Sequence, residues 1–189
     1  RTGRWTMMGV DEEDDKGMGN DDLVGKVQAQ SLPTKSSPIG EIFYGYLMLC
    51  ANSFQPAMGY LYRALALQQS DPLLCLLCGV ASLGRSTNRQ VDNRNHTIMQ
   101  GMALFTHYAE LRGDIPEVDY NFARAYHHLN LVHLAVPRYE RVLQRASSNA
   151  SKATFNMARE AAFNLAMIFT QSGSPDLARH LYRTWLAVE

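Results

Sequence analysis

Residues 38 to 45 read Pro-Ile-Gly-Glu-Ile-Phe-Tyr-Gly, and residues 72 to 79 read Pro-Leu-Leu-Cys-Leu-Leu-Cys-Gly. In both stretches a glycine follows a proline by seven residues, and the two glycines are 34 residues apart. Proline suits the first turn of a helix, where its missing N–H would have no intrahelical acceptor. A small residue seven positions later lets a second helix approach closely. The spacing predicts a repeated pair of antiparallel helices.

A period of 34 residues is that of the tetratricopeptide (TPR) helix pair. Small and large residues recur in the same frame further along the chain, at Ala57, Leu61 and Ala64, at Gly101, Phe105 and Tyr108, at Ala123, Ala135, Tyr139 and Val142, and at Ala166, Ala178, Tyr182 and Trp185. The prediction is an all-α TPR array of about four helix pairs over residues 38–189. The expected repeats are 38–71, 72–112 with an insertion at 85–96, 116–146 and 155–189.

Residues 1–37 differ from the rest in composition. They carry the acidic run Asp11-Glu12-Glu13-Asp14-Asp15 and the polar stretch 31–37. Such a segment buries too little apolar surface to offset its ordering entropy, which predicts a disordered acidic arm or linker. An acidic contact for a basic partner is the alternative interpretation.

The charge balance and the hydropathy exclude two classes of protein. The chain has 18 Lys plus Arg and 18 Asp plus Glu, so no global field favours an autonomous nucleic-acid binder. The longest apolar-leaning run, residues 73–84, falls short of the roughly 20 residues that cross a bilayer. We therefore expect no membrane partner.

Cys75 and Cys78 form a C-x-x-C motif, which elsewhere binds zinc or cycles through a disulfide. No second ligand pair and no preceding strand accompany it, so both cysteines are expected to pack as small hydrophobic residues in a buried helix. No cofactor is predicted.

Histidines and carboxylates also give no catalytic pattern. His127, His128 and His133 lack the spacing of three or four that places two metal ligands on one helical face. Glu117 and Asp119 lie at a helix start, where we interpret them as capping residues. The sequence predicts no catalytic residue and no metal ligand.

The first helices of the pairs are expected to line an inner, partner-binding surface. Its predicted residues mix aromatic, apolar and cationic side chains: Tyr46, Leu49, Tyr120, Arg124, His127, His128, Phe163, Met167 and Gln171. The insertion at 85–96 adds a second candidate surface through Arg85, Arg89 and Arg94, whose guanidinium groups suit phosphates or an acidic partner. A solvated loop is the alternative.

Several residues that a general TPR pattern does not require carry a more specific resemblance. They are Asn88-Arg89-Gln90, Asp92-Asn93-Arg94, Gln100-Gly101, Tyr120-Asn121 with Arg124, His127, Leu129, Leu131, His133-Leu134-Ala135-Val136-Pro137, Arg159-Glu160-Ala161-Ala162-Phe163-Asn164-Leu165, Gly173-Ser174-Pro175 and Leu177-Ala178-Arg179. In these residues the chain resembles the carboxyl-terminal TPR array of the TPR-bearing subunit of transcription factor IIIC.

The resemblance implies a nuclear, non-catalytic scaffold of the RNA polymerase III machinery. The implied partners are other transcription factor IIIC subunits, then TFIIIB subunits, with DNA reached mainly through the complex. A second copy of the chain is a further candidate, because a truncated stack exposes an uncapped end helix. One alternative is a TPR adaptor in another assembly, of ubiquitin ligase or co-chaperone type. The other is an enzyme, which the presence of bound zinc would indicate.

Overall fold

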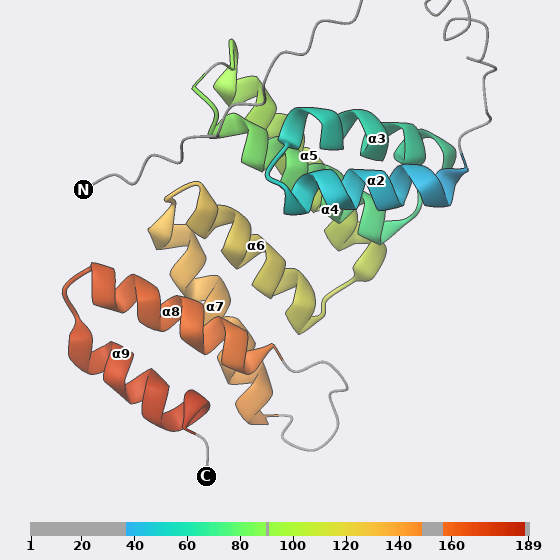
Figure 1. The fold of residues 1–189 in the computed structure, drawn as a ribbon. Coiled ribbons are helices and arrows are strands. Elements are labelled where there is room, and N and C mark those ends of the chain that lie inside the picture. Colours follow the sequence, from blue (N-terminus) through green and yellow to red (C-terminus); the bar gives the residue numbers. More distant parts are fainter. Residues whose placement is uncertain (1–36, 90, 149–156, 188–189) are drawn as a thin grey trace, which may run out of the picture. The chain divides into compact units, whose positions relative to one another are not determined.

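The computed structural model describes residues 37–89, 91–148 and 157–187, and these form helices joined by turns, with no strand among them (Figure 1). The elements are α2 (Pro38–Cys50), α3 (Phe54–Leu67), α4 (Pro72–Ser86), α5 (Arg94–Arg112), α6 (Pro116–His128), α7 (Val132–Ser148), α8 (Ala158–Gln171), α9 (Pro175–Leu181) and the π-helical turn η1 (Tyr182–Leu186). The all-α prediction is confirmed for these residues. The expected acidic arm, except Ser37, and most of the segment between the third and fourth expected repeats lie outside them.

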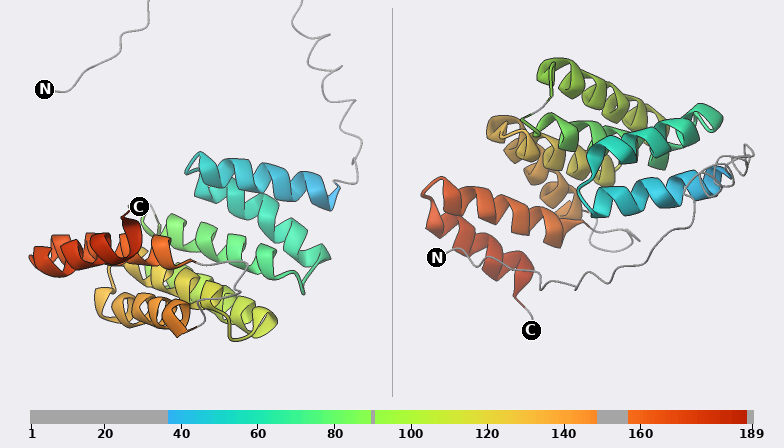
Figure 2. Two further views of the ribbon diagram at one scale, coloured as in Figure 1. Left: turned by 90° about the horizontal axis from the view of Figure 1, so that it is seen from below. Right: turned by 45° about the horizontal axis from the view of Figure 1, so that its top comes forward.

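The helices pack in chain order as pairs. α2 packs against α3, α4 against α5, α6 against α7, and α8 against α9. Adjacent pairs meet where α3 contacts α4, where α5 contacts α6, and where α7 contacts α8 (Figures 1 and 2). The first helices also touch one another, α2 with α4 and α4 with α6. None of the described helices is long and apolar enough to cross a membrane.

Two glycines set the closest approaches between paired helices. A Cβ atom added at Gly45 would lie 2.6 Å from Cγ of Leu61, and one added at Gly79 would lie 2.7 Å from Cδ2 of Phe105. Real Cβ atoms do not come this close to a neighbour, so any side chain at either glycine would separate the helices. The predicted meeting of a small residue with a large one is confirmed in the first two pairs.

Alanine takes the place of glycine in the last two pairs. Ala123 and Ala166 are fully buried in a core cluster that joins α6, α7, α8 and α9 around Tyr139.

The fourth pair departs from the predicted positions of core residues at its end. Tyr182 is 39% exposed, although the sequence pattern assigned it to the core, and Trp185 packs only partly. Both lie in η1, where the π-helical turn rotates side chains away from the α-helical positions.

The loop between α4 and α5 is shorter than the insertion at 85–96 that the sequence predicted. α4 continues to Ser86 and α5 begins at Arg94, not near Thr97. The Oδ1 atom of Asn93 accepts a hydrogen bond of 2.9 Å from the backbone N–H of His96, so Asn93 caps α5 three residues earlier than expected. The extra residues therefore lengthen two helices as well as the turn. The exact division into four repeats stays a prediction.

The close approach at Gly79 leads to a test by substitution. Gly79→Ala places a methyl group against the ring of Phe105, and we expect a loss of about 1–3 kcal/mol in the free energy of unfolding. Gly40→Ala is the matched control. Nothing lies within 4 Å of its new methyl group, so the higher helix propensity of alanine should stabilise α2 by about 0.5–1 kcal/mol. Urea unfolding measures both, and equal effects would contradict the packing described here.

Candidate partner-binding surface

The structure places the nine predicted surface residues on α2, α6 and α8 with unequal exposure. Tyr46, Phe163 and Met167 are 53%, 48% and 37% exposed, which is high for large apolar side chains. Arg124, His128 and Gln171 are also exposed, and Leu49 and His127 are half-buried. These side chains are therefore accessible to a partner in whole or in part.

Tyr120 differs from the other eight predicted residues because it is only 8% exposed. Its ring packs against Tyr139 with a centroid distance of 6.1 Å, and its hydroxyl oxygen accepts a hydrogen bond of 3.3 Å from Nδ2 of Asn164. This hydrogen bond ties α6 to α8. Tyr120 is thus mainly a core residue with one edge at the surface.

A hollow of about 290 Å³ lies between α2, α4 and α6. It brings together three of the predicted residues, Leu49, Arg124 and His128. Its apolar side includes Val80 and Leu83 of α4, which the sequence analysis did not assign to the surface. Both lie in the long apolar run of α4, a pattern that indicates core residues, although Val80 is 41% exposed.

A second hollow of about 290 Å³ lies between α6 and α8. Phe163 and the edge of Tyr120 line it, together with Arg159 and Asn164. The inner side of the first helices is therefore uneven, with apolar recesses bordered by polar groups. Such recesses accept side chains of a bound protein segment.

The three arginines of the expected insertion do not form one cluster around a hollow. Arg85 is half-buried on α4 and lines a recess of about 350 Å³ with Asn88 and Ser53. Arg89 is exposed in the turn after α4, and Arg94 is exposed as the first residue of α5. Neither of these two lines that recess.

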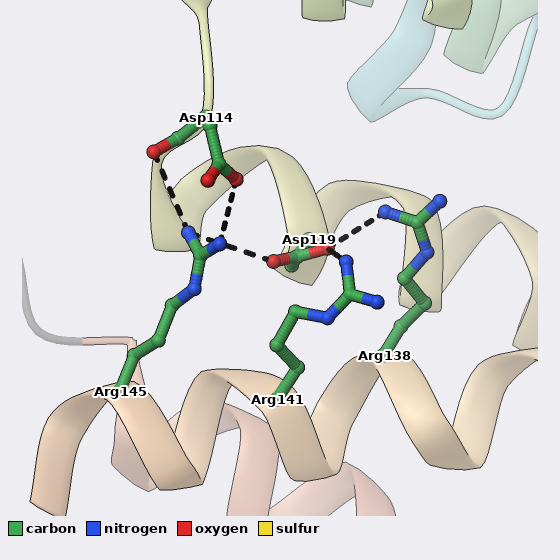
Figure 3. Close-up of polar contacts among 5 residues, drawn as sticks. All are labelled: Asp114, Asp119, Arg138, Arg141 and Arg145. Carbon is green, nitrogen blue, oxygen red and sulfur yellow. Dashed lines mark hydrogen bonds and ion pairs between the residues drawn. The ribbon is translucent and has the colours of Figure 1, made fainter.

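Asp119 has a different role from the capping role that its position suggested. Its carboxylate is buried, and Oδ1 accepts hydrogen bonds from Arg138 at 2.7 Å and Arg141 at 3.3 Å (Figure 3). Arg145 lies 3.8 Å from Oδ2 and also bonds Asp114 at 2.6 Å. Asp119 therefore fixes α6 against one face of α7.

Glu117 also acts between helices and does not cap its own. The hydroxyl of Tyr108 on α5 donates a 2.8 Å hydrogen bond to Oε1 of Glu117, and Arg112 pairs with the other carboxylate oxygen. Asn121 donates to the same Tyr108 hydroxyl at 2.9 Å. Burial, followed by the bond to Glu117, raises the pKa of Tyr108 to about 12, so this hydroxyl keeps its proton and joins the second pair to the third.

The cysteines and histidines lie as core and surface residues. Cys75 and Cys78 are fully buried in α4, as predicted, and burial raises the pKa of both thiols, that of Cys78 to about 12. His127 packs edge-on against Tyr139, and its burial, with Arg124 nearby, lowers its pKa. No group of three or more potential metal ligands occurs among residues 37–89, 91–148 and 157–187.

Fold and surface together define a helical-repeat protein of the TPR type, whose paired helices present the side chains of their first members. No protein-family model matches the sequence. It is 34% identical to the transcription factor tau subunit sfc4 of Schizosaccharomyces pombe over 82% of this chain and 17% of that protein. It is 31% identical to the transcription factor tau 131 kDa subunit of Saccharomyces cerevisiae over 82% of this chain and 15% of that protein.

A human protein, general transcription factor 3C polypeptide 3, is 27% identical over 78% of this chain and 17% of its own length. The chain belongs to the family of these transcription factor IIIC subunits. It spans about a sixth of the length of the three relatives.

The Asp119 network leads to a prediction about stability. Asp119→Asn removes the charge that three arginines share, and we expect a loss of about 1–3 kcal/mol in the free energy of unfolding. Asp176→Asn is the control, because the Asp176–Arg179 pair is exposed and should contribute less than about 1 kcal/mol. If urea unfolding shows no difference between the two variants, Asp119 does not fix α6 to α7.

The burial of two cysteines leads to a prediction about thiol reactivity. At about pH 8 a disulfide reagent should label the exposed Cys50 quickly and Cys75 and Cys78 slowly, because burial excludes the reagent and raises the pKa of both buried thiols. In denaturant all three should react at similar rates. Fast labelling of three thiols in the folded protein would show that α4 is not buried as described.

Proposed function

We propose that this chain is a non-catalytic TPR scaffold of transcription factor IIIC in the nucleus, and that it holds other subunits of that complex through the first helices of its pairs. Family membership supports the complex, because the relatives are transcription factor subunits by name. The exposed inner residues support the mode of binding, because aromatic, methionine and arginine side chains are enriched in protein interfaces.

The single observation that carries the proposal is the exposure of Tyr46, Phe163 and Met167 on first helices. Their positions follow from the repeat frame, which points one side of each first helix away from its paired helix. Large apolar side chains on this exposed side of the first helices become favourable contacts when a partner removes them from water. A surface of this kind suits protein association better than chemistry on a small substrate.

We also propose further partners and a further contact surface for this chain. TFIIIB subunits are proposed partners during initiation at internal promoters, and DNA is reached mainly through the rest of the complex, because the chain's charges balance. Arg89 and Arg94 are proposed as a second contact surface at the turn between α4 and α5. Self-association through an end helix is the remaining proposal for the isolated chain.

Affinity purification of the tagged chain from nuclear extract tests the proposal. We expect other transcription factor IIIC subunits to copurify, and Phe163→Ala with Met167→Ala to reduce their recovery severalfold because two exposed apolar contacts are removed. Leu177→Ala is the matched control. Leu177 is 52% exposed but lies on the second helix α9, so recovery should not change.

Copurification of a ubiquitin ligase or a chaperone complex, without subunits of transcription factor IIIC, would favour an adaptor in another assembly and refute the scaffold proposal. Equal recovery with the Phe163→Ala/Met167→Ala variant and with wild type would refute the assignment of the inner surface. Circular dichroism of each variant shows whether the helices are retained.

A further inference from the structure

Two of the hollows adjoin one another. The hollow between α2, α4 and α6 and the recess at Arg85 share the residues Asn52 and Phe54, which lie at the turn between α2 and α3. We call these two adjoining hollows together the Phe54 groove. One part of it includes Arg124 and His128, and the other includes Arg85 and Asn88.

Phe54 separates the two parts of the groove because Gly84 leaves room for its ring. A Cβ atom added at Gly84 would lie 2.3 Å from Cε1 of Phe54. The ring therefore lies directly on the backbone of α4, between Leu83 on one side of the groove and Arg85 on the other. The ring of Phe54 thus borders the apolar floor of the hollow between α2, α4 and α6.

The groove has a clear charge bias in a chain whose total charges balance. Of the residues that the structure describes, none that lines its two parts is acidic, while Arg85, Arg124 and His128 are among those that do. Within the described part of the chain, no carboxylate forms an ion pair with Arg85 or Arg124. The first turn of α3, which begins at Phe54, adds the positive end of a helix dipole.

We propose that the Phe54 groove binds an extended acidic segment of a partner protein. One apolar side chain of that segment enters the hollow beside Leu49, Val80 and Leu83, and flanking carboxylates face Arg124 on one side and Arg85 on the other. The inference rests on the proposed scaffold function and names the chemistry that one of its contacts recognises. The hollow, at about 290 Å³, suits a single side chain more than a drug-sized ligand.

An acidic protein segment fits the groove better than a nucleic acid does. Two arginines and one histidine around an apolar floor offer few phosphate contacts, whereas duplex binding needs an extended row of them. Paired guanidinium and carboxylate groups at the rim of an apolar recess are the arrangement that gives a protein interface its orientation.

Fluorescence anisotropy with the full chain tests the proposal. The probe is a labelled synthetic peptide with a central phenylalanine and two glutamates on each side, and the comparison peptide has glutamine in place of every glutamate. We expect the acidic peptide to bind at least tenfold more tightly, with affinity that falls as salt is raised. Arg85→Glu and Arg124→Glu should each weaken binding about tenfold, because each reverses one contact.

Arg183→Glu is the matched control, since Arg183 is exposed on η1, which contacts α8 and α9. Its affinity for the acidic peptide should equal that of wild type. Equal binding of the two peptides would overturn the proposal, and so would arginine variants that bind as wild type does. A labelled DNA duplex that bound more tightly than the peptide and lost affinity in the same variants would overturn it in favour of nucleic acid.

The same samples separate this inference from the proposed function. Tagged wild-type chain is used in parallel to recover transcription factor IIIC subunits from nuclear extract. Recovery of those subunits without acidic-peptide binding rejects the Phe54 groove and leaves the scaffold function standing. Peptide binding without recovery of those subunits rejects the scaffold function in transcription factor IIIC, and with it the identity of the partner.

Discussion

The structure depends on the close approach of two helices at one small residue in each pair. Leu61 lies over Gly45 and Phe105 lies over Gly79, so each second helix is seated on the backbone of its first. Ala123 and Ala166, both fully buried, hold the same place in the later pairs. Because this contact fixes which side of the first helix is covered, it also fixes which side stays open to a partner.

Buried and half-buried carboxylates then hold neighbouring helices in position. Glu41 on α2 is paired with Arg63 on α3 at 2.8 Å, Glu117 joins α6 to α5, and Asp119 joins α6 to α7. Each carboxylate accepts a hydrogen bond from a side chain on another helix, so a change of packing would leave a charge poorly paired. Arg124 and Arg85 form no such pair within the described residues, and both line recesses.

Local spacing explains what the sequence could predict. The prolines at the starts of α2, α4 and α6 and the small residues seven positions later are visible in the chain itself, and they gave the helix pairs correctly. The Asp119 network was missed because the two arginines that donate hydrogen bonds to Asp119 lie 19 and 22 residues away on another helix. The sequence did contain one signal of the network, because the spacing of Arg138, Arg141 and Arg145 places them on one face of α7. Of the nine candidate surface residues, six are exposed, Leu49 and His127 are half-buried, and Tyr120 is buried, since periodicity does not show that Tyr139 of α7 packs against its ring.

Hydroxyl-radical footprinting of the chain, free and assembled with its partners, tests the central claim that first helices form the binding surface. We expect Phe163 and Met167 on α8 to be oxidised more slowly in the assembly, because a partner covers them. Met99 on α5, 72% exposed, and Leu177 on α9, 52% exposed, should react as in the free chain. Protection of Met99 and Leu177, with Phe163 and Met167 unchanged, would contradict the assignment of the inner surface.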